Sequence, residues 1–194
     1  FRRLEISARR RKLALAATAP YIGCESKEPP MSYVARDDRP ADKAARYAEV
    51  EAEILAVLDG EPNRTARMAT VASMLADAFP VFFWTGFYVV DPDKADELVV
   101  GPYQGTLGCL RIAFGRGVCG TAAATRQTQL VEDVHAFPGH IACDGASNSE
   151  IVIPLRRGGE IIGVLDVDSP IFNRFDQEDR IGLEETVQIL ESML

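Results

Sequence analysis

Apolar residues recur at helical spacing in two consecutive stretches, residues 41–60 and 61–80. The apolar stripe of the first stretch consists of Tyr47, Val50, Ile54, Val57 and Leu58. The stripe of the second stretch consists of Met68, Val71, Met74, Leu75 and Phe79. A period near 3.6 residues predicts a helix in each stretch, the first ending at Gly60 and the second at Pro80.

The middle of the chain changes to β patterns. Residues 82–91 (FFWTGFYVVD) are aromatic and β-branched and predict a strand, and residues 97–105 and 128–134 predict two shorter strands. Residues 150–169 contain two apolar runs separated by the letters RRGG, which is typical of a β-hairpin.

Two further helices are expected. Residues 118–127 follow a run of glycines and predict a short helix. Residues 176–194 begin with a cap-like Asp176, followed three residues later by Asp179, and Gly182 is the weak point of this helix. The apolar stripe of this last helix consists of Leu183, Val187, Leu190 and Leu194.

The order of the elements indicates the fold class. Two helices precede two strands, and a short helix, a strand, a hairpin and a final helix follow. Antiparallel connections dominate this order, so we expect an α+β domain with a central antiparallel sheet and helices packed on it. The domain spans residues 40–194, which is long enough to bury a sizeable core.

The first thirty residues differ from the rest in composition. They contain seven basic residues against three acidic ones, with apolar residues interspersed. We predict a basic arm over residues 1–30, and three interpretations stay open: a disordered arm, an organelle transit peptide, or sequence upstream of a true start at Met31. Cys24 lies in this arm, and we assign it no chemistry.

Charge and cysteine count narrow the function classes. The formal net charge is −8, which argues against nucleic acid as a partner because phosphates need a basic surface. No apolar run approaches the ~20 residues that a membrane span needs. The four cysteines show no CxxC spacing in a chain of 194 residues. This pattern argues against a disulfide scaffold, and we expect a cytoplasmic protein.

The position of Cys143 indicates reactivity. This cysteine lies in a polar loop, HIACDGASNSE, just before an apolar run. An inert cysteine usually packs among apolar neighbours as a small hydrophobic residue. The loop therefore predicts a reactive thiol, with a chance placement as the alternative.

Two aspartates share one face of a predicted strand. In IIGVLDVDS, strict alternation points Asp166 and Asp168 to one face and Leu165 and Val167 to the other. Carboxylates ~7 Å apart repel each other and raise one pKa, and such a pair suits an ammonium ligand or a general acid. The alternative is a solvated strand end, which this strand by itself favours.

Aromatic residues and glycines give weaker signals. Trp84 and Tyr88 share a face with Gly86 between them, where the missing side chain leaves room for a ligand, although ordinary core aromatics are the favoured alternative. Cys119 stands at a helix start after Gly117. A helix N-terminus can lower the pKa of a thiol, and the alternative is that Cys119 packs inertly against the sheet. The backbone amides at this helix start are a weak signal for an anion site.

No metal centre is expected from the cysteines and histidines. The spacing of Cys109, Cys119 and Cys143 with His135 and His140 fits no zinc site. We therefore expect neither a metal ion nor another cofactor.

Several motifs occur together in this chain: WTGFYVV, GPYQG, the cysteines Cys109, Cys119 and Cys143, HIACDGASNSEIVIPL, and GVLDVDSP followed by FD. This set resembles the free methionine-(R)-sulfoxide reductases, which are stand-alone GAF-domain enzymes. The resemblance runs from about residue 40 to the C-terminus. It implies a GAF-like fold and the thiol-dependent reduction of free methionine-(R)-sulfoxide.

The resemblance also implies a role for each motif residue. Cys143 would attack the sulfoxide sulfur and become a sulfenic acid, Cys109 would form a disulfide with it that thioredoxin reduces, and Cys119 would be an alternative resolving thiol. The implied substrate-binding residues are Glu150, Asp166, Asp168, Trp84 and Tyr88. The carboxylates would hold the substrate ammonium and help to protonate the sulfoxide oxygen, and the aromatic rings would surround the methyl end.

The expected partners are free methionine sulfoxide as the substrate and thioredoxin as the reductant. We expect binding to neither nucleic acid nor a membrane, and the sequence allows a homodimer. Two other classes of protein stay open. A non-catalytic GAF module that senses a small ligand would share the fold, because fold does not decide function. A redox switch without a substrate would keep the cysteines but would not need the acidic strand.

Overall fold

The computed structural model describes residues 38–141, 143 and 145–194. The basic arm predicted for residues 1–30, with Cys24, therefore lies outside the described residues. The domain boundary near residue 40 stays a prediction. Within the described part of the chain, no helix combines the length and the apolar character that crossing a membrane requires.

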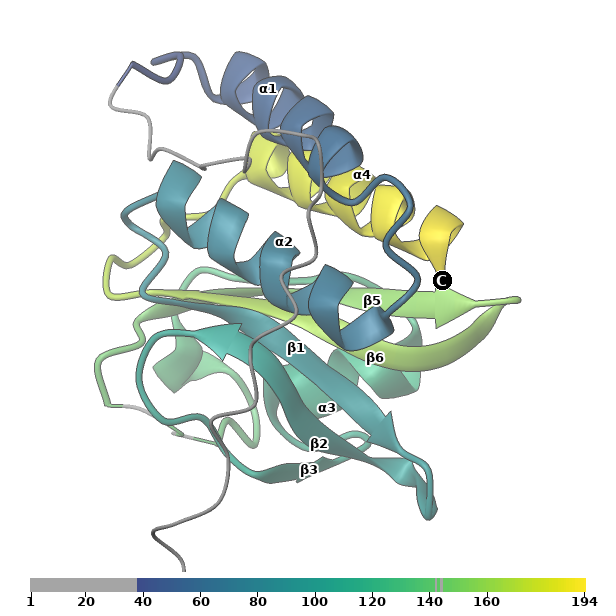
Figure 1. The fold of residues 1–194 in the computed structure, drawn as a ribbon. Helices are drawn as coiled ribbons and strands as arrows, with labels where there is room; N and C mark the ends of the chain where they lie inside the picture. Colours follow the sequence, from purple (N-terminus) through teal and green to yellow (C-terminus); the bar gives the residue numbers. More distant parts are fainter. Residues whose placement is uncertain (1–37, 142, 144) are drawn as a thin grey trace, which may run out of the picture. The chain divides into compact units, whose positions relative to one another are not determined.

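A six-stranded antiparallel sheet forms the centre of the fold (Figure 1). Its strands are β1 (Trp84–Asp91), β2 (Lys94–Gln104), β3 (Arg111–Ala113), β4 (Gln129–Val131), β5 (Ser149–Arg157) and β6 (Glu160–Ser169). They lie in the order β3-β2-β1-β6-β5-β4. The predicted α+β fold with a central antiparallel sheet is confirmed. The sequence pattern missed β3, because a strand of three residues is too short to show alternation.

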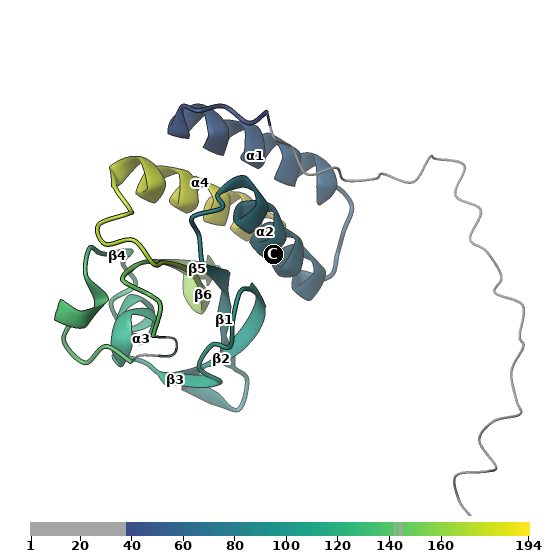
Figure 2. The ribbon, with the colours of Figure 1, turned by 90° about the vertical axis from the view of Figure 1, so that its left-hand side faces the viewer.

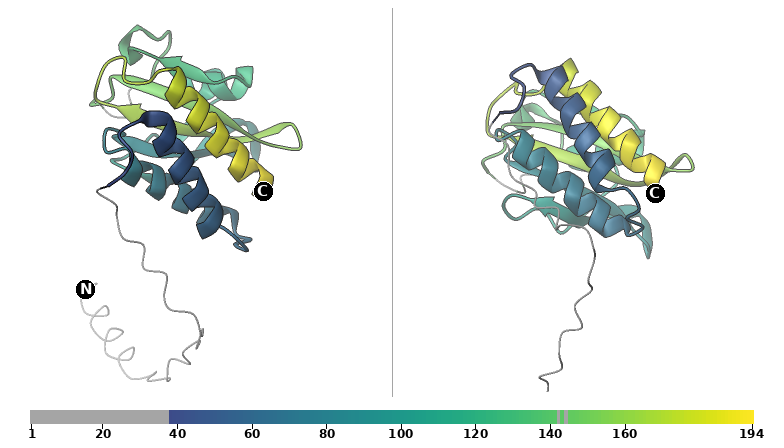
Figure 3. Two further views of the ribbon diagram at one scale, coloured as in Figure 1. Left: turned by 90° about the horizontal axis from the view of Figure 1, so that it is seen from above. Right: turned by 45° about the horizontal axis from the view of Figure 1, so that its top comes forward.

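Helices cover the two faces of the sheet unequally (Figures 1 and 2). On one face, α2 (Arg64–Ala78) contacts β1 and β2, and α4 (Gln177–Met193) contacts β5. Helix α1 (Lys43–Val57) packs against both α2 and α4, and Figure 3 shows the three helices together in front of the sheet. On the other face, the short α3 (Gly117–Thr125) contacts β5 and β6. All four predicted helices are therefore present.

The helix ends follow from local sequence. The Asp42 side chain accepts a hydrogen bond from a backbone amide in the first turn of α1, and Asp176 forms a capping box with Asp179 at the start of α4, as its spacing predicts. Gly182 does more than weaken α4. A Cβ there would lie 2.2 Å from Cγ of Tyr47, so the glycine lets α1 and α4 approach each other closely.

The predicted hairpin is present between β5 and β6. Arg157 pairs with Glu160, and the turn between them consists of Gly158 and Gly159, with φ of +59° and +87°. Two successive positive φ angles are those of a tight hairpin turn, which glycine adopts without steric cost.

One predicted strand is shorter than expected. Residues 128–134 contain only β4, which ends at Val131. After it, the Asp133 side chain accepts a hydrogen bond from the His135 amide at 2.9 Å and caps a single 3-10 turn over Val134–Ala136. Local side-chain capping therefore ends the strand early.

Side chains of the sheet divide between two buried clusters. The three-helix core lies under α1, α2 and α4 and includes Phe87 and Leu165. The α3 core lies on the opposite face and includes Trp84, Tyr88 and Val164. The predicted alternation along residues 161–169 is confirmed, since Leu165 and Val164 lie in different clusters.

Candidate active site

Three neighbouring strands present the predicted substrate-binding residues to one pocket on the α3 side of the sheet. The pocket is lined by Trp84 and Tyr88 of β1, Glu150 of β5, and Asp166 and Asp168 of β6. Asp168 is the register partner of Trp84 on one side and of Glu150 on the other. The empty space at the pocket amounts to about 510 Å³, which includes open solvent at its mouth.

Two of the three described cysteines are joined at this pocket. Cys109 and Cys143 form a disulfide with their Cα atoms 5.1 Å apart, and Cys143 lines the pocket. Both residues are half-buried. Cys143 lies outside the helices and strands, as predicted, and the reactivity of its thiol stays a prediction. Its disulfide partner is the cysteine that the resemblance implied.

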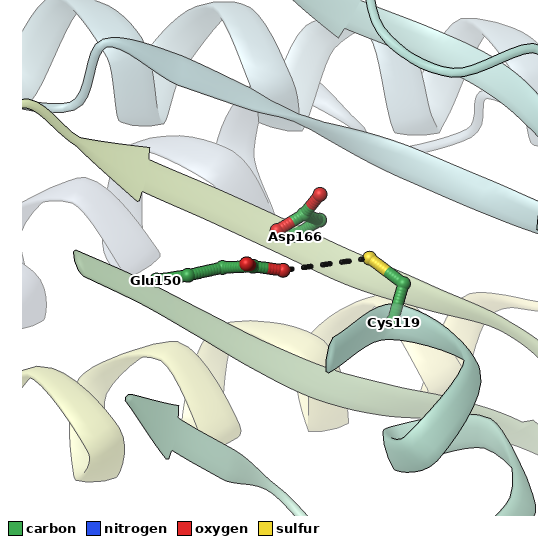
Figure 4. A group of neighbouring side chains, drawn as sticks. All are labelled: Cys119, Glu150 and Asp166. Carbon is green, nitrogen blue, oxygen red and sulfur yellow. Dashed lines mark hydrogen bonds between the residues drawn. The ribbon is translucent and has the colours of Figure 1, made fainter. Parts of the chain in front are cut away.

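Cys119 lies deeper, on the first turn of α3. Its buried thiol is free and donates a hydrogen bond to Glu150 Oε1 at 3.8 Å (Figure 4). Burial, together with the charges of Asp166 and Glu150, raises the pKa of the Cys119 thiol well above its usual value. The lowered pKa considered for this helix start is wrong, because burial and the two carboxyl groups outweigh the effect of the helix end.

Glu150 and Asp166 are buried carboxyl groups, only 6% and 5% exposed. Burial raises the pKa of Asp166 to about 7, and burial and the charge of Asp166 raise the pKa of Glu150. Oδ1 of Asp166 has no hydrogen-bond partner among the described residues. The interpretation of a solvated strand end is therefore wrong for Asp166. The expected cause of its raised pKa is corrected as well, since burial dominates and not repulsion from Asp168.

The two predicted aromatic residues form a stacked pair. The rings of Trp84 and Tyr88 lie with centroids 5.6 Å apart and planes inclined by 21°. Trp84 Nε1 donates a hydrogen bond to the Thr106 carbonyl at 3.1 Å. Burial and the charge of Asp166 raise the pKa of Tyr88, so its hydroxyl keeps its proton. The pair belongs to the α3 core and also walls the pocket, so the two interpretations of these residues are compatible.

Two glycines decide how closely β2 and the loop after it approach these rings. A Cβ at Gly86 would lie 2.2 Å from Cβ of Tyr103, so the missing side chain makes room for Tyr103. The predicted room for a ligand at this glycine is therefore wrong. A Cβ at Gly108 would lie 2.8 Å from the Tyr88 hydroxyl. Gly108 therefore lets the loop that carries Cys109 lie against Tyr88. Sequence reasoning missed this glycine, although its position beside Cys109 was a usable signal.

Two further residues were not predicted to line the pocket. Arg116 precedes α3, and His140, which was weighed only as a metal ligand, is the first residue of the Cys143 loop; both line the pocket. Partial burial, together with the charge of His135, lowers the pKa of His140. Both residues flank a cysteine motif in the sequence, which was the signal that pointed to them.

The Cys/His set weighed in the sequence does not come together as a metal site. Among the described residues, one group has the spacing of metal ligands, and it consists of Cys119, Glu150 and Asp166. Its three ligand atoms lie within 4.8 Å of one another, and neither histidine belongs to it.

Comparison with known proteins places this geometry in a family. The GAF domain family model matches residues 65–194. The free methionine-R-sulfoxide reductase of Escherichia coli (strain K12) is 48% identical over 153 residues, which cover 79% of this chain and 91% of that protein. This chain belongs to the free methionine-R-sulfoxide reductase family.

Two other members of the free methionine-R-sulfoxide reductase family extend the comparison. The Saccharomyces cerevisiae enzyme is 40% identical over 137 residues, which cover 68% of this chain and 76% of the yeast protein. The Neisseria meningitidis enzyme, whose X-ray structure contains its substrate, has 49% sequence identity with this chain. The two structures superpose with a TM-score of 0.76, and the match covers 79% of this chain and 91% of that one. The predicted family and its GAF-like fold are therefore confirmed.

Proposed function

We propose that this protein reduces free methionine-(R)-sulfoxide to methionine, with Cys143 as the nucleophile. One observation carries the proposal: the Cys109–Cys143 disulfide lies at a pocket lined by buried carboxyl groups, and Oδ1 of Asp166 has no hydrogen-bond partner among the described residues. Relatives at 48% and 40% identity bear the name of this activity, which supports the choice of substrate. A reductase that cycles through a disulfide needs its attacking sulfur beside the substrate and a second thiol within reach of the sulfenic acid.

The proposed reaction has three steps. The Cys143 thiolate attacks the sulfoxide sulfur, the oxygen passes to Cys143 with uptake of one proton, and methionine leaves a sulfenic acid behind. The Cys109 thiol then attacks Cys143, expels water and forms the disulfide. An external dithiol reduces that disulfide and becomes oxidised. Glu150 and Asp166 suit the proton donation, since their raised pKa values keep protons available near neutral pH.

The pocket carboxyl groups also suit recognition of a free amino acid. Oδ1 of Asp166 lies buried without a partner among the described residues, and an ammonium group would supply the missing donor. Trp84 and Tyr88 offer an apolar wall for the methyl end of the substrate. A peptide-bound methionine has an uncharged amide in place of the ammonium, so it loses this interaction.

The same carboxyl groups oppose the chemistry of Cys143 when the pocket is empty. Negative charge nearby disfavours a thiolate, and the thiolate is the nucleophile. The substrate ammonium offsets the acidic charge. We infer that Cys143 is activated only when methionine sulfoxide is bound, which protects the thiol between turnovers.

Thioredoxin suits the reducing step. Leu107 and Leu110 are 81% and 75% exposed and lie on either side of Cys109 in the chain. Exposed apolar side chains beside a disulfide favour docking of a protein dithiol over a small polar thiol. A homodimer and a cytoplasmic location stay predictions.

A thioredoxin-coupled assay with separate (R) and (S) epimers of free methionine sulfoxide tests the proposal. We expect turnover of the free (R) epimer and little turnover of the (S) epimer or of N-acetyl-methionine sulfoxide. Tight binding of a small ligand without any methionine release would instead support the sensing module. Disulfide formation that proceeds equally with and without methionine sulfoxide would support the redox switch.

A further inference from the structure

The base of the pocket joins three potential ligand atoms from three elements. Figure 4 shows Cys119 of α3 facing Glu150 of β5 and Asp166 of β6. The three ligand atoms lie within 4.8 Å of one another, and all three residues are buried. We call this group the Cys-Glu-Asp cluster. It combines one soft sulfur with two hard carboxyl oxygens.

One atom of the Cys-Glu-Asp cluster lacks a partner. Asp166 is only 5% exposed and lines the pocket, yet its Oδ1 has no hydrogen-bond partner in the described part of the chain. Buried polar groups in proteins are nearly always satisfied, so this oxygen indicates a missing ligand. The second acidic side chain of the cluster, Glu150, lies close to Asp166, and two carboxyl groups together favour a cation.

We propose that Cys119, Glu150 and Asp166 bind a zinc ion and that zinc competes with the substrate for the pocket. The donor set selects the metal, because magnesium and calcium prefer oxygen alone and thiolate favours zinc. Zinc bonds of about 2.3 Å to sulfur and about 2.1 Å to oxygen, at a tetrahedral angle, place the two ligand atoms about 3.6 Å apart. The sulfur of Cys119 lies 3.8 Å from Glu150 Oε1, so this pair is already close to that spacing, and all three ligand atoms lie within 4.8 Å of one another.

Zinc binding must displace protons from the Cys-Glu-Asp cluster. The thiol proton of Cys119 leaves to solvent, together with any proton that the two carboxyl groups hold, and the affinity therefore rises with pH. The other titratable or charged groups that line the pocket are Tyr88, Arg116, His140 and Asp168. The fourth position of the metal faces the pocket, where water or an added ligand completes the tetrahedron.

Competition with the substrate is the part that rests on the proposed function. Glu150 and Asp166 are the groups proposed to hold the substrate ammonium, so a bound zinc ion and a bound substrate exclude each other. The cluster would then make the enzyme sensitive to free zinc. Metal binding itself does not depend on turnover and is tested separately.

The first experiment uses the oxidised full chain with Cys24→Ser. Because Cys109 and Cys143 are tied in the disulfide, Cys119 is then the one remaining thiol of the four cysteines. Equilibrium dialysis should find one zinc ion per chain. Cobalt(II) in place of zinc should give a thiolate-to-cobalt charge-transfer absorption in the near ultraviolet. This absorption tests the sulfur ligand in the parent protein, without any substitution in the cluster.

Variants then assign the ligands. Cys119→Ser should remove the cobalt absorption and weaken zinc binding more than about tenfold, since even outer-shell changes at metal sites cost about 10–100-fold. His135→Asn is the matched control, because His135 and His140, with ring centroids 6.3 Å apart, are the rival zinc ligands near the pocket. This variant should bind zinc as the parent does. Absence of zinc binding, binding unchanged by Cys119→Ser, or binding lost in His135→Asn would overturn the site.

A displacement experiment tests the competition. The chain with Cys24, Cys109 and Cys143 all replaced by Ser keeps Cys119 as its one thiol and cannot turn over. Free methionine sulfoxide should lower its cobalt absorption, and the N-acetyl compound should leave it unchanged. A Cys119-dependent absorption that free methionine sulfoxide does not displace would overturn the competition. If the chain binds zinc through Cys119 but never reduces methionine sulfoxide, the proposed function fails and the metal site stands.

Discussion

Leu165 and Asp166 are neighbours on β6, yet their side chains enter opposite environments. Leu165 is fully buried in the three-helix core, among apolar side chains of α1, α2 and α4. Asp166 is almost as deeply buried, but it faces a pocket, keeps one oxygen without a partner among the described residues and has a raised pKa. The two faces of one sheet therefore separate stability from chemistry.

The difference between the two faces has an energetic reason. Burying a carboxyl group without a partner costs free energy, and packing elsewhere in the domain must offset that cost. The face under three helices supplies that packing. The face under α3 alone leaves room for a pocket. Substitutions on the two faces should therefore change different measured quantities.

The largest effect is expected at the mouth of the pocket. Cys143→Ser should abolish the release of methionine from free methionine-(R)-sulfoxide even in a single turnover, because the nucleophile is gone. Thermal unfolding of the reduced variant should match that of the reduced parent. Rapid quenching followed by amino-acid analysis measures the methionine released.

Cys109→Ser is the matched comparison for this variant, since it removes the other sulfur of the same disulfide. It should release about one methionine per chain and then stall, because the sulfenic acid has no partner thiol. Substantial methionine release by Cys143→Ser would contradict the assignment of the nucleophile. Normal multiple turnover by Cys109→Ser would move the resolving role to Cys119.

The next effect concerns stability alone. Leu165→Ala should lower the free energy of unfolding by about 2–5 kcal/mol, because it leaves a cavity in the three-helix core. Below the unfolding temperature, its kcat/KM for free methionine sulfoxide should stay close to that of the parent. Urea unfolding and steady-state kinetics measure the two quantities. A large loss of kcat/KM in folded Leu165→Ala would show that the faces are not independent.

Local patterns in the sequence were sufficient for the scaffold. Helical stripes identified α1, α2 and α4, and the hairpin letters located Gly158 and Gly159. Alternation placed Trp84 with Tyr88 on one face of their strand and Asp166 with Asp168 on one face of theirs, because a strand has a period of two residues whatever packs on it. These features depend on residues that are close together in the chain, so they can be recognised in a single sequence.

Features that depend on distant segments were predicted less well. Alternation places Asp166 on a face but does not tell that α3 covers that face, so the solvated interpretation was favoured wrongly. The space at Gly86 was weighed as room for a ligand, because the residue that fills it, Tyr103, comes from another strand. The deep position of Cys119 beside Glu150 needs the packing of α3 on β5, which no local pattern encodes.

Asp166→Asn tests the pocket face at the residue next to Leu165. Losing a charge-assisted hydrogen bond to the substrate ammonium should cost about 1.5–3 kcal/mol, or roughly 10- to 150-fold in kcat/KM for free methionine sulfoxide. The variant also removes a proposed proton donor, and that loss is common to both substrates, so N-acetyl-methionine sulfoxide should lose less and the preference for the free amino acid should shrink. Stability should be kept or raised above pH 7, where the buried carboxylate of the parent is ionised. Equal losses on both substrates would contradict an ammonium site.

The smallest effect concerns an exception on the three-helix side. Glu51 of α1 has a buried Oε1 without a hydrogen-bond partner among the described residues, and burial and the charge of Glu185 raise the pKa of Glu51 to about 7. A carboxyl group with a raised pKa in the folded state binds its proton more tightly there than in the unfolded chain. Its contribution to stability is therefore present below pH 4.5 and is lost as the pH rises towards 7.

Glu51→Gln removes this titration. The free energy of unfolding of the variant, measured relative to that of the parent, should therefore be higher at pH 8 than at pH 5, by about 1 kcal/mol once solvent screening of this half-buried group is allowed for. Glu185→Gln should give a smaller change of the same sign, because it removes only the repelling charge. Chemical unfolding of the three proteins at pH 5 and pH 8 measures these free energies. If the difference in stability between the parent and Glu51→Gln is the same at both pH values, Glu51 is ionised throughout and the prediction is wrong.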